Sequence, residues 1–264
     1  MNFNNKTFWI TGAASGMGKA VAEALSNYNT VLIISDRDKK GLEETAKIIE
    51  QNGSKAIVQE LDMSNSELIS KTAEQILSKV KNIDGLYQFA GISQRSLVVE
   101  TPIENDRLIM EINFFGVVAL AKAVLPVMIK NGGGQFAVAS SLVGKFGFPY
   151  RSAYSASKHA LHGFFETLLA ENHDKNIKVS ILIGGRIKTN ISKFAIEKDG
   201  KEHGKLDAGQ ANGISAEKAA SQILKGLKKE KIEIPIGKKE LLMLKIKRFL
   251  PKLSFKMART LKPM

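Results

Sequence analysis

The sequence predicts an α/β fold in which seven parallel strands form one sheet with helices on both faces. Short apolar runs rich in β-branched residues alternate along the chain with longer segments of helical periodicity, which is typical of parallel sheets. The run Val31–Ile34 contains no polar residue, as expected for a strand buried on both faces. The expected strands are residues 7–10, 30–34, 55–61, 84–89, 135–140, 177–183 and 231–236, and the expected helices are residues 16–28, 38–52, 65–81, 104–130, 151–173 and 215–229.

Length and composition indicate one globular domain. The chain has 264 residues, of which 44% are apolar and 25% charged, and it shows neither a linker nor a repeat. We expect one domain over residues 1–237 and an extension over residues 238–264. The absence of cysteine excludes disulfides, thiol nucleophiles and Cys-ligated metals, and the four histidines lack the spacing of a zinc motif, so no metal is expected.

The N-terminal sequence MNFNNKTFWITG lacks the pattern of a signal peptide. No run of about 18 apolar residues is evident, so we expect no membrane-spanning helix. These features predict a cytoplasmic protein that is not secreted.

A glycine-rich turn, TGAASGMG, spans residues 11–18 between the first expected strand and the first expected helix. Gly12, Gly16 and Gly18 allow the backbone to approach a pyrophosphate, and the helix N-terminus behind them offers free N–H groups and a positive dipole end. The alternative for three glycines alone is a turn with no ligand. The strand–turn–helix context favours a dinucleotide.

Two charged residues end the second expected strand. The carboxylate of Asp36 can accept hydrogen bonds from both hydroxyls of an adenosine ribose and would repel a 2′-phosphate, which favours NAD(H). Arg37 could instead bind a 2′-phosphate, and this keeps NADP(H) as the alternative. A third interpretation makes Asp36 a helix cap before Lys39 and Lys40.

A tyrosine and a lysine lie four residues apart in YSASK, so Tyr154 and Lys158 share one face of a helix. A free tyrosine has a pKa of about 10 and is a weak acid–base group at neutral pH, and a nearby ammonium lowers that pKa. Ser141 lies at the end of the buried run QFAVASS, where the strands of such sheets face a ligand crevice. Taken alone, Ser141 is more simply interpreted as a turn or cap serine.

Together these motifs resemble the short-chain dehydrogenase/reductase family across residues 6 to about 236. Five motifs agree in order and spacing: TGAASGMG, Asp62 after the third expected strand, Asn113 in INFFG, Ser141 and YSASK. The resemblance implies a Rossmann-like, doubly wound sheet. It also implies an enzyme that transfers a hydride between a nicotinamide cofactor and a hydroxyl or carbonyl group.

The same resemblance implies a role for individual residues. Tyr154 would be the general acid or base, Lys158 would lower its pKa and hold the nicotinamide ribose, and Ser141 would bind the substrate oxygen. Asn113 would stabilise a helix kink and hold a water that links Lys158 to solvent, and Asp62 would contact the adenine. The cofactor would be bound by Gly12, Ser15, Gly16, Met17, Gly18, Asp36, Arg37, Asp62, Met63, Ala90, Gly91, Tyr154, Lys158, Gly185, Ile187 and Thr189.

Two positions depart from the family pattern. Phe89 replaces an asparagine that steadies the central sheet, which affects local stability more than catalysis. Gly184 and Gly185 replace Pro-Gly after the sixth expected strand, so we expect a looser loop leading into residues 190–213. That polar segment lacks periodicity and is expected to be a lid.

The residues between Ser141 and Tyr154 border the substrate in this family, and here they are largely apolar. Together with apolar residues of the expected lid, they favour a hydrophobic alcohol or ketone, steroid- or lipid-like, over a sugar or small acid. The alternative places them in the core or in a subunit interface. The residues concerned are Leu142, Val143, Phe146, Phe148, Pro149, Ile191, Phe194, Ala195 and Ile196.

The formal net charge of +13 is concentrated near the C-terminus, where residues 225–264 carry 13 Lys/Arg and three acidic residues. An apolar arc with basic residues on the remainder predicts a basic amphipathic helix, which Pro251 should kink or split. Such a helix either lies on an anionic membrane surface or packs on the core or a second subunit, and nucleic acid is not the expected partner. The arc consists of Leu242, Ile246, Phe249, Leu250, Leu253, Met257 and Leu261.

Three functions are compatible with the sequence. We favour an NAD(P)-dependent oxidoreductase acting on a hydrophobic small molecule, and the tail leaves peripheral membrane association and packing on the protein both open. The alternatives are a catalytically silent, cofactor-binding scaffold that acts through its basic tail, and another reaction on the same scaffold, such as epimerisation or dehydration. By resemblance, a homodimer or homotetramer would form through residues 104–130 and 151–173.

Overall fold

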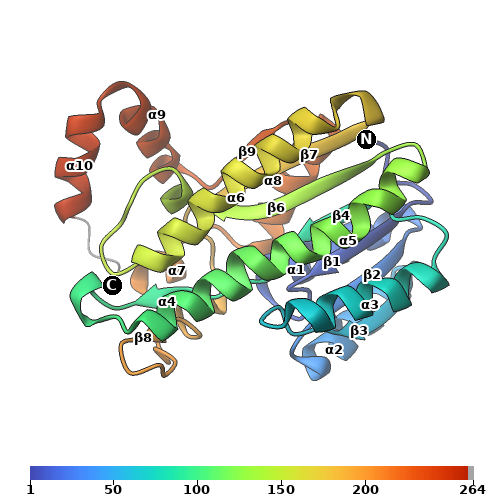
Figure 1. The fold of residues 1–264 in the computed structure, drawn as a ribbon, viewed down its shortest axis with the longest axis horizontal. Coiled ribbons are helices and arrows are strands. Elements are labelled where there is room, and N and C mark those ends of the chain that lie inside the picture. The colour runs from blue at the N-terminus through green and yellow to red at the C-terminus, as the bar shows by residue number, and fades with distance from the viewer. Residues whose placement is uncertain (261–264) are drawn as a thin grey trace.

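The computed structural model describes residues 1–260, which form a sheet of seven parallel strands between two layers of helices (Figure 1). The strand order is β3-β2-β1-β4-β6-β7-β9, so the winding reverses between β1 and β4, and the predicted doubly wound sheet is confirmed. The strands are β1 (Thr7–Thr11), β2 (Val31–Asp36), β3 (Lys55–Glu60), β4 (Gly85–Gln88), β6 (Gly134–Ser141), β7 (Ile177–Gly184) and β9 (Glu233–Ile236).

Helices cover both faces of this sheet because each helix presents one apolar side. On one face, α1, α2 and α8 bury residues such as Val21, Leu42 and Leu224 against the strands. On the other face, α3, α5 and α6 bury residues such as Ile69 and Phe165. The helices of the two layers are α1 (Gly16–Leu25), α2 (Lys39–Gln51), α3 (Ser66–Lys79), α5 (Gly116–Lys130), α6 (Ser152–Glu171) and α8 (Ala216–Lys228).

The reversal between β1 and β4 determines where a ligand can bind. Both strands leave the sheet at the same edge, and the connections that follow them run to opposite faces, which opens a crevice at their carboxyl ends. The glycine-rich turn follows β1, Asp36 ends β2, and Ala90 and Gly91 follow β4. The topology therefore gathers the predicted site residues at one edge.

The segment expected to be a lid contains short regular elements that the sequence did not indicate. Residues 190–192 form a single 3₁₀ turn, β8 (Ile196–Glu197) is a two-residue strand, and α7 (Ala208–Ala211) is one turn of helix. Strand β8 pairs in parallel with β5 (Gln94–Arg95), which follows β4. The lid segment is thus hydrogen-bonded to the loop beyond the main sheet.

The longest helical region, Ile103–Lys130, corrects one expectation from the sequence. It consists of α4 (Ile103–Met110), a π-helical turn (Glu111–Phe115) and α5, and it is long and apolar enough to cross a membrane. Lys122 interrupts the apolar run in the sequence. Length and composition alone do not distinguish a spanning helix from a core helix, and α5 packs buried residues such as Leu120 against the sheet.

The C-terminal extension forms two helices at one end of the molecule (Figure 1, red). Helix α9 (Leu242–Phe249) ends before Pro251, where α10 (Pro251–Thr260) begins, so the predicted split is observed. The residues that pack inward differ in part from the predicted arc. Met243, Leu244 and Ile246 pack near Leu142, whereas most of the predicted arc is exposed, and Leu261 lies outside the described residues.

Candidate active site

A cavity of about 480 Å³ opens at the carboxyl edge of the sheet. Strand ends and the loops after β1, β2, β3 and β4 line it, together with the start of the lid segment. Most of the predicted cofactor residues lie there, whereas Tyr154, Lys158, Gly185 and Ile187 do not line it. The lining includes Gly12, Ser15, Gly16, Met17, Gly18, Asp36, Arg37, Asp62, Met63, Ala90, Gly91 and Thr189.

The glycines of the turn after β1 are required by backbone crowding. Gly12 has a φ of +70°, and a Cβ at this position would lie 2.6 Å from the amide nitrogen of Ala90. A Cβ on Gly18 would lie 2.1 Å from the carbonyl oxygen of Gly12. Helix α1 starts here with no side-chain cap at Ser15, so its first N–H groups remain available to an anion. This cradle fits the pyrophosphate of a dinucleotide.

Asp36 lies at the end of β2 and does not cap the following helix. Its carboxylate accepts hydrogen bonds from the amides of Ala14 and Asp38, both at 3.2 Å, whereas Asp38 caps α2 by accepting from the Gly41 amide at 3.0 Å. Arg37 is mostly exposed and lies 3.7 Å from the carboxylate of Glu202 in the lid segment. Both predicted determinants of cofactor choice therefore lie at the cavity, and Arg37 already has an acidic partner.

The four predicted catalytic residues come together beyond the inner end of this cavity. Ser141 ends β6, Tyr154 and Lys158 lie one turn apart on α6, and Asn113 is the centre of the π-helical turn. Lys158 Nζ donates to the carbonyl of Ala139 at 2.7 Å. A Cβ on the cavity residue Gly91 would lie 2.8 Å from Asn113 Oδ1 and 3.5 Å from Lys158 Nζ, which shows how closely the two groups of residues approach.

Burial controls the protonation of Tyr154 and Lys158. Desolvation raises the pKa of Tyr154, and the cation of Arg151, a hydrogen bond with Ser141 and the cation of Arg95 oppose that rise. Burial also lowers the pKa of Lys158 to about 8. At neutral pH the tyrosine holds its proton beside a charged lysine, and this is the state needed to protonate a carbonyl oxygen.

Asn113 holds the loop after β4 through its side-chain amide. Its Oδ1 accepts from the Ile92 amide at 2.8 Å, and its Nδ2 donates to the Ile92 carbonyl at 2.9 Å and to Ser157 Oγ at 3.1 Å. The π-helical turn places this side chain toward both partners, as the expected helix kink implies.

The two departures from the family pattern have structural partners. Phe89 packs against the core on the α1 face and also lines the cavity. The loop that was expected to be loose is held at two points: Gly185 N donates to the carbonyl of Ile236 at 2.8 Å, and Arg186 N donates to Glu240 at 2.9 Å. Ile187 is buried in the core beneath the cavity.

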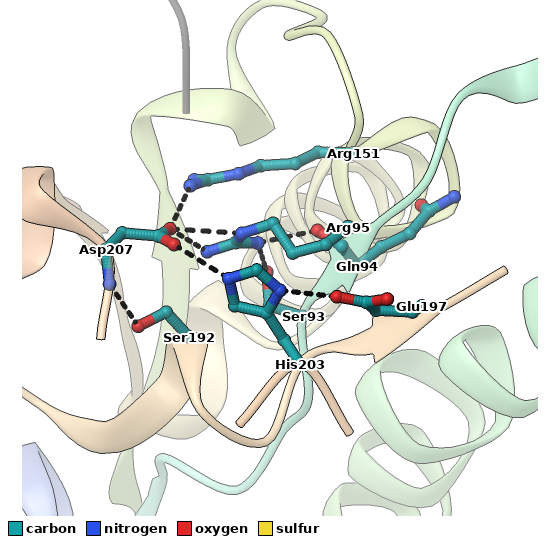
Figure 2. Close-up of polar contacts among 8 residues, drawn as sticks. All are labelled: Ser93, Gln94, Arg95, Arg151, Ser192, Glu197, His203 and Asp207. Carbon is teal, nitrogen blue, oxygen red and sulfur yellow. Dashed lines mark hydrogen bonds and ion pairs between the residues drawn. The ribbon is translucent and has the colours of Figure 1, made fainter. Parts of the chain in front are cut away.

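The sequence gives no signal for a polar network around Asp207, which Figure 2 shows. Arg95 and Arg151 converge on the carboxylate of Asp207 from β5 and from the start of α6. No motif marks these residues, since arginine and aspartate in loops are usually exposed. The network comprises Ser93, Gln94, Arg95, Arg151, Ser192, Glu197, His203 and Asp207.

One group of side chains in the described residues has the spacing of a metal site. His162, Glu166 and Glu233 place one ligand atom each within 4.8 Å of one another. Lys145 already lies 2.5 Å from Glu233 and supplies a cation there, and both glutamates are largely exposed. The expectation that the chain holds no metal stays a prediction.

Comparison with known proteins identifies the family of the chain. A model of the short chain dehydrogenase family matches residues 6–200. The chain therefore belongs to the short chain dehydrogenase family, and it is a dehydrogenase/reductase.

Two similar proteins carry the same name. The chain is 36% identical to "Dehydrogenase/reductase SDR family member 7B" of Danio rerio, over 88% of this chain and 77% of the relative. It is 37% identical to the Mus musculus protein of the same name, over 87% and 72%.

Solved structures share the fold across nearly the whole chain. A short chain dehydrogenase/reductase from Burkholderia phymatum in complex with NAD has a TM-score of 0.83 at 20% identity, covering 100% of this chain and 98% of the other. An alcohol dehydrogenase from Thermococcus sibiricus complexed with 5-hydroxy-NADP has a TM-score of 0.76 at 24% identity, covering 90% and 98%.

We expect carbonyl reduction to slow as the pH rises past about 8, because Lys158 then loses its charge. Tyr154 still holds its proton there, since burial raises its pKa. The measurement is the initial rate of reduction of an apolar dicarbonyl such as phenanthrenequinone at saturating reduced cofactor, across the neutral and alkaline range. Lys158→Arg keeps a cation of higher pKa, so the fall in reduction rate should begin at a higher pH. The exposed control Lys130→Arg should leave the pH of this fall unchanged. If Lys158→Arg also left it unchanged, the fall would not be due to the charge of Lys158.

Proposed function

We propose that the protein transfers a hydride between NAD(H) and the hydroxyl or carbonyl carbon of a hydrophobic, steroid- or lipid-like molecule. The proposal depends most on one observation: Ser141, Tyr154 and Lys158 lie together just beyond the cavity that holds the dinucleotide cradle, and the cavity residue Gly91 closely approaches Lys158. A scaffold that only bound a cofactor would not need a buried tyrosine with a positioned lysine and serine.

The chemistry assigned to the side chains follows from their protonation. A bound nicotinamide would supply or accept the hydride. In reduction, Tyr154 gives its phenolic proton to the substrate oxygen, and Ser141 donates a hydrogen bond to the same oxygen. The ammonium of Lys158 then stabilises the phenolate that remains. In oxidation, the same groups act in reverse.

The preference for NAD(H) is supported by the charges at the outer end of the cavity. Asp36 lines the cavity, and two backbone amides hold its carboxylate. We infer that an adenosine ribose binds beside this carboxylate. A 2′-phosphate would meet this negative charge. Arg37, the cation that could compensate for it, lies 3.7 Å from the carboxylate of Glu202.

The hydrophobic substrate is supported by four apolar side chains, Ile92, Ile112, Ile191 and Phe194, at the cavity wall. Two of the residues that were expected to border the substrate pack against the C-terminal helices instead. Leu142 and Phe146 are buried in a small cluster beneath the C-terminal helices. The support therefore rests on the loop after β4, the π-helical turn and the lid segment.

We also propose that the C-terminal helices dock on an anionic membrane surface. Leu242, Phe249, Leu250, Leu253 and Phe255 are all exposed, with Phe249 the most exposed at 71%. Basic residues alternate with them, as expected for a helix that inserts its apolar side between lipid headgroups. Such docking would bring the active site close to a lipid-like substrate.

The enzymatic role is tested by Tyr154→Phe. We expect turnover of an apolar dicarbonyl to fall by about 100-fold or more, because the proton donor is gone, while the fluorescence titration with NADH keeps its affinity. Tyr28→Phe, far from the site, is the control. Cofactor binding by the natural chain without turnover on a broad panel of ketones and alcohols would support the silent scaffold instead.

Cofactor choice is tested by separate fluorescence titrations with NADH and NADPH. We expect tighter binding of NADH, and we expect Asp36→Asn to reduce the NADH preference by about tenfold or more, because it removes the charge and keeps the shape. Tighter binding of NADPH by the natural chain would mean that Arg37 governs the pocket.

Membrane docking is tested by co-sedimentation with phosphatidylcholine vesicles that contain or lack phosphatidylserine. We expect binding to the anionic vesicles, weakened by salt, and a loss of about tenfold or more in the double variant Phe249→Ser, Leu253→Ser, because each side chain buries apolar area in the interface. Val99→Ser, at a residue 89% exposed elsewhere on the surface, is the control. If the double variant and the Val99→Ser control bound the anionic vesicles equally well, the proposal would be wrong.

A further inference from the structure

Asp207 of the lid segment binds two arginines from different parts of the fold (Figure 2). Arg95 on β5 donates from Nε at 3.0 Å and from a terminal nitrogen at 2.5 Å to the same carboxylate oxygen. Arg151, directly before α6, approaches that oxygen at 3.6 Å. The side chains of Arg95 and Asp207 are almost completely buried, at 4% and 1% exposure. A buried ion pair that joins distant segments has a strong structural effect, because breaking it leaves an uncompensated buried charge.

The residue next to Arg95 connects the same strand to the catalytic helix. Gln94 Oε1 accepts from the amides of Ala153 at 2.9 Å and Tyr154 at 3.4 Å, which are free donors in the first turn of α6. Gln94 Nε2 donates to Ser152 Oγ at 3.1 Å. Strand β5 therefore holds the start of the tyrosine helix with one residue and the lid with the next.

The lid is fixed to this strand by more than one contact. Asp207 N donates to Ser192 Oγ at 3.1 Å, so the beginning and the end of the lid segment are joined to each other. His203 bridges two lid carboxylates, with Nδ1 2.6 Å from Glu197 and Nε2 3.4 Å from Asp207. Glu197 belongs to β8, which pairs with β5. Asp207 therefore takes part in the contacts with Ser192, His203 and Arg95.

Positive charge exceeds negative charge around Tyr154 among the described residues. Arg95 satisfies one oxygen of Asp207, whereas Arg151 has only the longer contact, and its buried Nε has no hydrogen-bond partner. Arg151 also lies over the ring of Phe148, 5.5 Å from its centre. The charged and titratable groups that face this region are Arg151 directly before α6, Lys158 from α6, Arg95 from β5, Arg186 after β7, and Glu197, His203 and Asp207 from the lid.

We propose that Arg95, Arg151 and Asp207 are positioning residues for the hydride transfer. The Arg95–Asp207 pair clamps the lid segment, residues 190–213, against the first turn of α6, and Arg151 places a second cation beside Tyr154. The proposal rests on the assigned role of Tyr154 as the proton donor and acceptor. In this proposal, Arg151 stabilises the phenolate of Tyr154 independently of Lys158.

The second cation has a clear use in the chemistry. Among the groups that lower the pKa of Tyr154 against its burial, the guanidinium of Arg151 is the largest, followed by the hydrogen bond with Ser141 and by Arg95. The pKa of Arg151 itself is lowered to about 10, chiefly by burial, so this side chain stays charged where Lys158, with a pKa of about 8, does not. Arg151 therefore keeps a cation beside the phenolate in alkaline solution.

The charge on Tyr154 is tested without any substrate. The full chain is labelled with ¹³C at the tyrosine Cζ, the Tyr154 resonance is assigned with Tyr154→Phe, and its chemical shift is followed against pH. We expect Arg151→Gln to move the Tyr154 titration to higher pH, because a cation that stabilises the phenolate is lost. The exposed control Arg107→Gln should leave the titration in place. A titration that is unchanged or moves to lower pH in Arg151→Gln would overturn the role of Arg151.

The clamp is tested by hydrogen–deuterium exchange of the same full chain. We expect Asp207→Asn to reduce the protection of amides in residues 190–213 by roughly tenfold or more, because the buried pair with Arg95 is broken. Asp199→Asn, an isosteric change in the same segment at an exposed carboxylate, is the control. If the amides of residues 190–213 were as well protected in Asp207→Asn as in the natural chain, the proposed clamp would be wrong.

The two variants also separate the two roles. Arg151→Gln leaves the Arg95–Asp207 pair intact, so lid protection should stay within about twofold of the natural chain. If both variants instead loosen the lid and shift Tyr154 in the same direction, the residues only maintain the local fold and the proposal fails. Neither readout needs turnover, so failure here is distinct from failure of the proposed enzymatic role, which Tyr154→Phe decides.

Discussion

The amide of Asn113 forms hydrogen bonds in both directions with the backbone of Ile92, and the arrangement of the whole site depends on this contact. It fixes the loop after β4, which carries Gly91 at the cavity, Gln94 at the first turn of α6 and Arg95 at the lid. Because Asn113 is fully buried, a side chain that could not satisfy both backbone groups would leave polar atoms without partners. One side chain thus sets the spacing between cofactor cradle, catalytic helix and lid.

The cost of burying charge explains why most of these buried groups have a hydrogen-bond partner, with Asp207 Oδ1 and Arg151 Nε as exceptions. Lys158, Arg95 and Asp207 are all removed from solvent, and each would be unfavourable there without a hydrogen-bonding partner. Lys158 uses the carbonyl of Ala139, and the other two use each other. Under the proposed function, the buried cations of Lys158 and Arg95 would stabilise a phenolate at Tyr154 in a water-poor site, and Asp207 balances the charge of Arg95.

The sequence predicts the sheet because buried parallel strands such as Val31–Ile34 are continuous apolar runs, and it predicts the cradle because Gly12 and Gly18 have no room for a Cβ. It does not predict β5 and β8, since two-residue strands have no periodicity. The network of Arg95, Arg151 and Asp207 was also missed, because pairing between loops far apart in sequence leaves no local pattern. The inward face of the tail also differs from the predicted arc. Met243 and Leu244 pack inward in α9, before the break at Leu250, because tertiary contacts decide which side of an amphipathic helix meets the protein.

The C-terminal helices connect the active site to the protein surface. Glu240, just before α9, accepts from the amide of Arg186, and Met243 packs in the same cluster as Leu142, the residue after Ser141. The opposite side of the extension exposes Phe249 and its neighbours. The extension thus contacts the loop after β7 through Glu240 and the residue next to Ser141 through Met243. The same two helices therefore have one side packed beside the predicted site and another side that the proposed membrane docking would use.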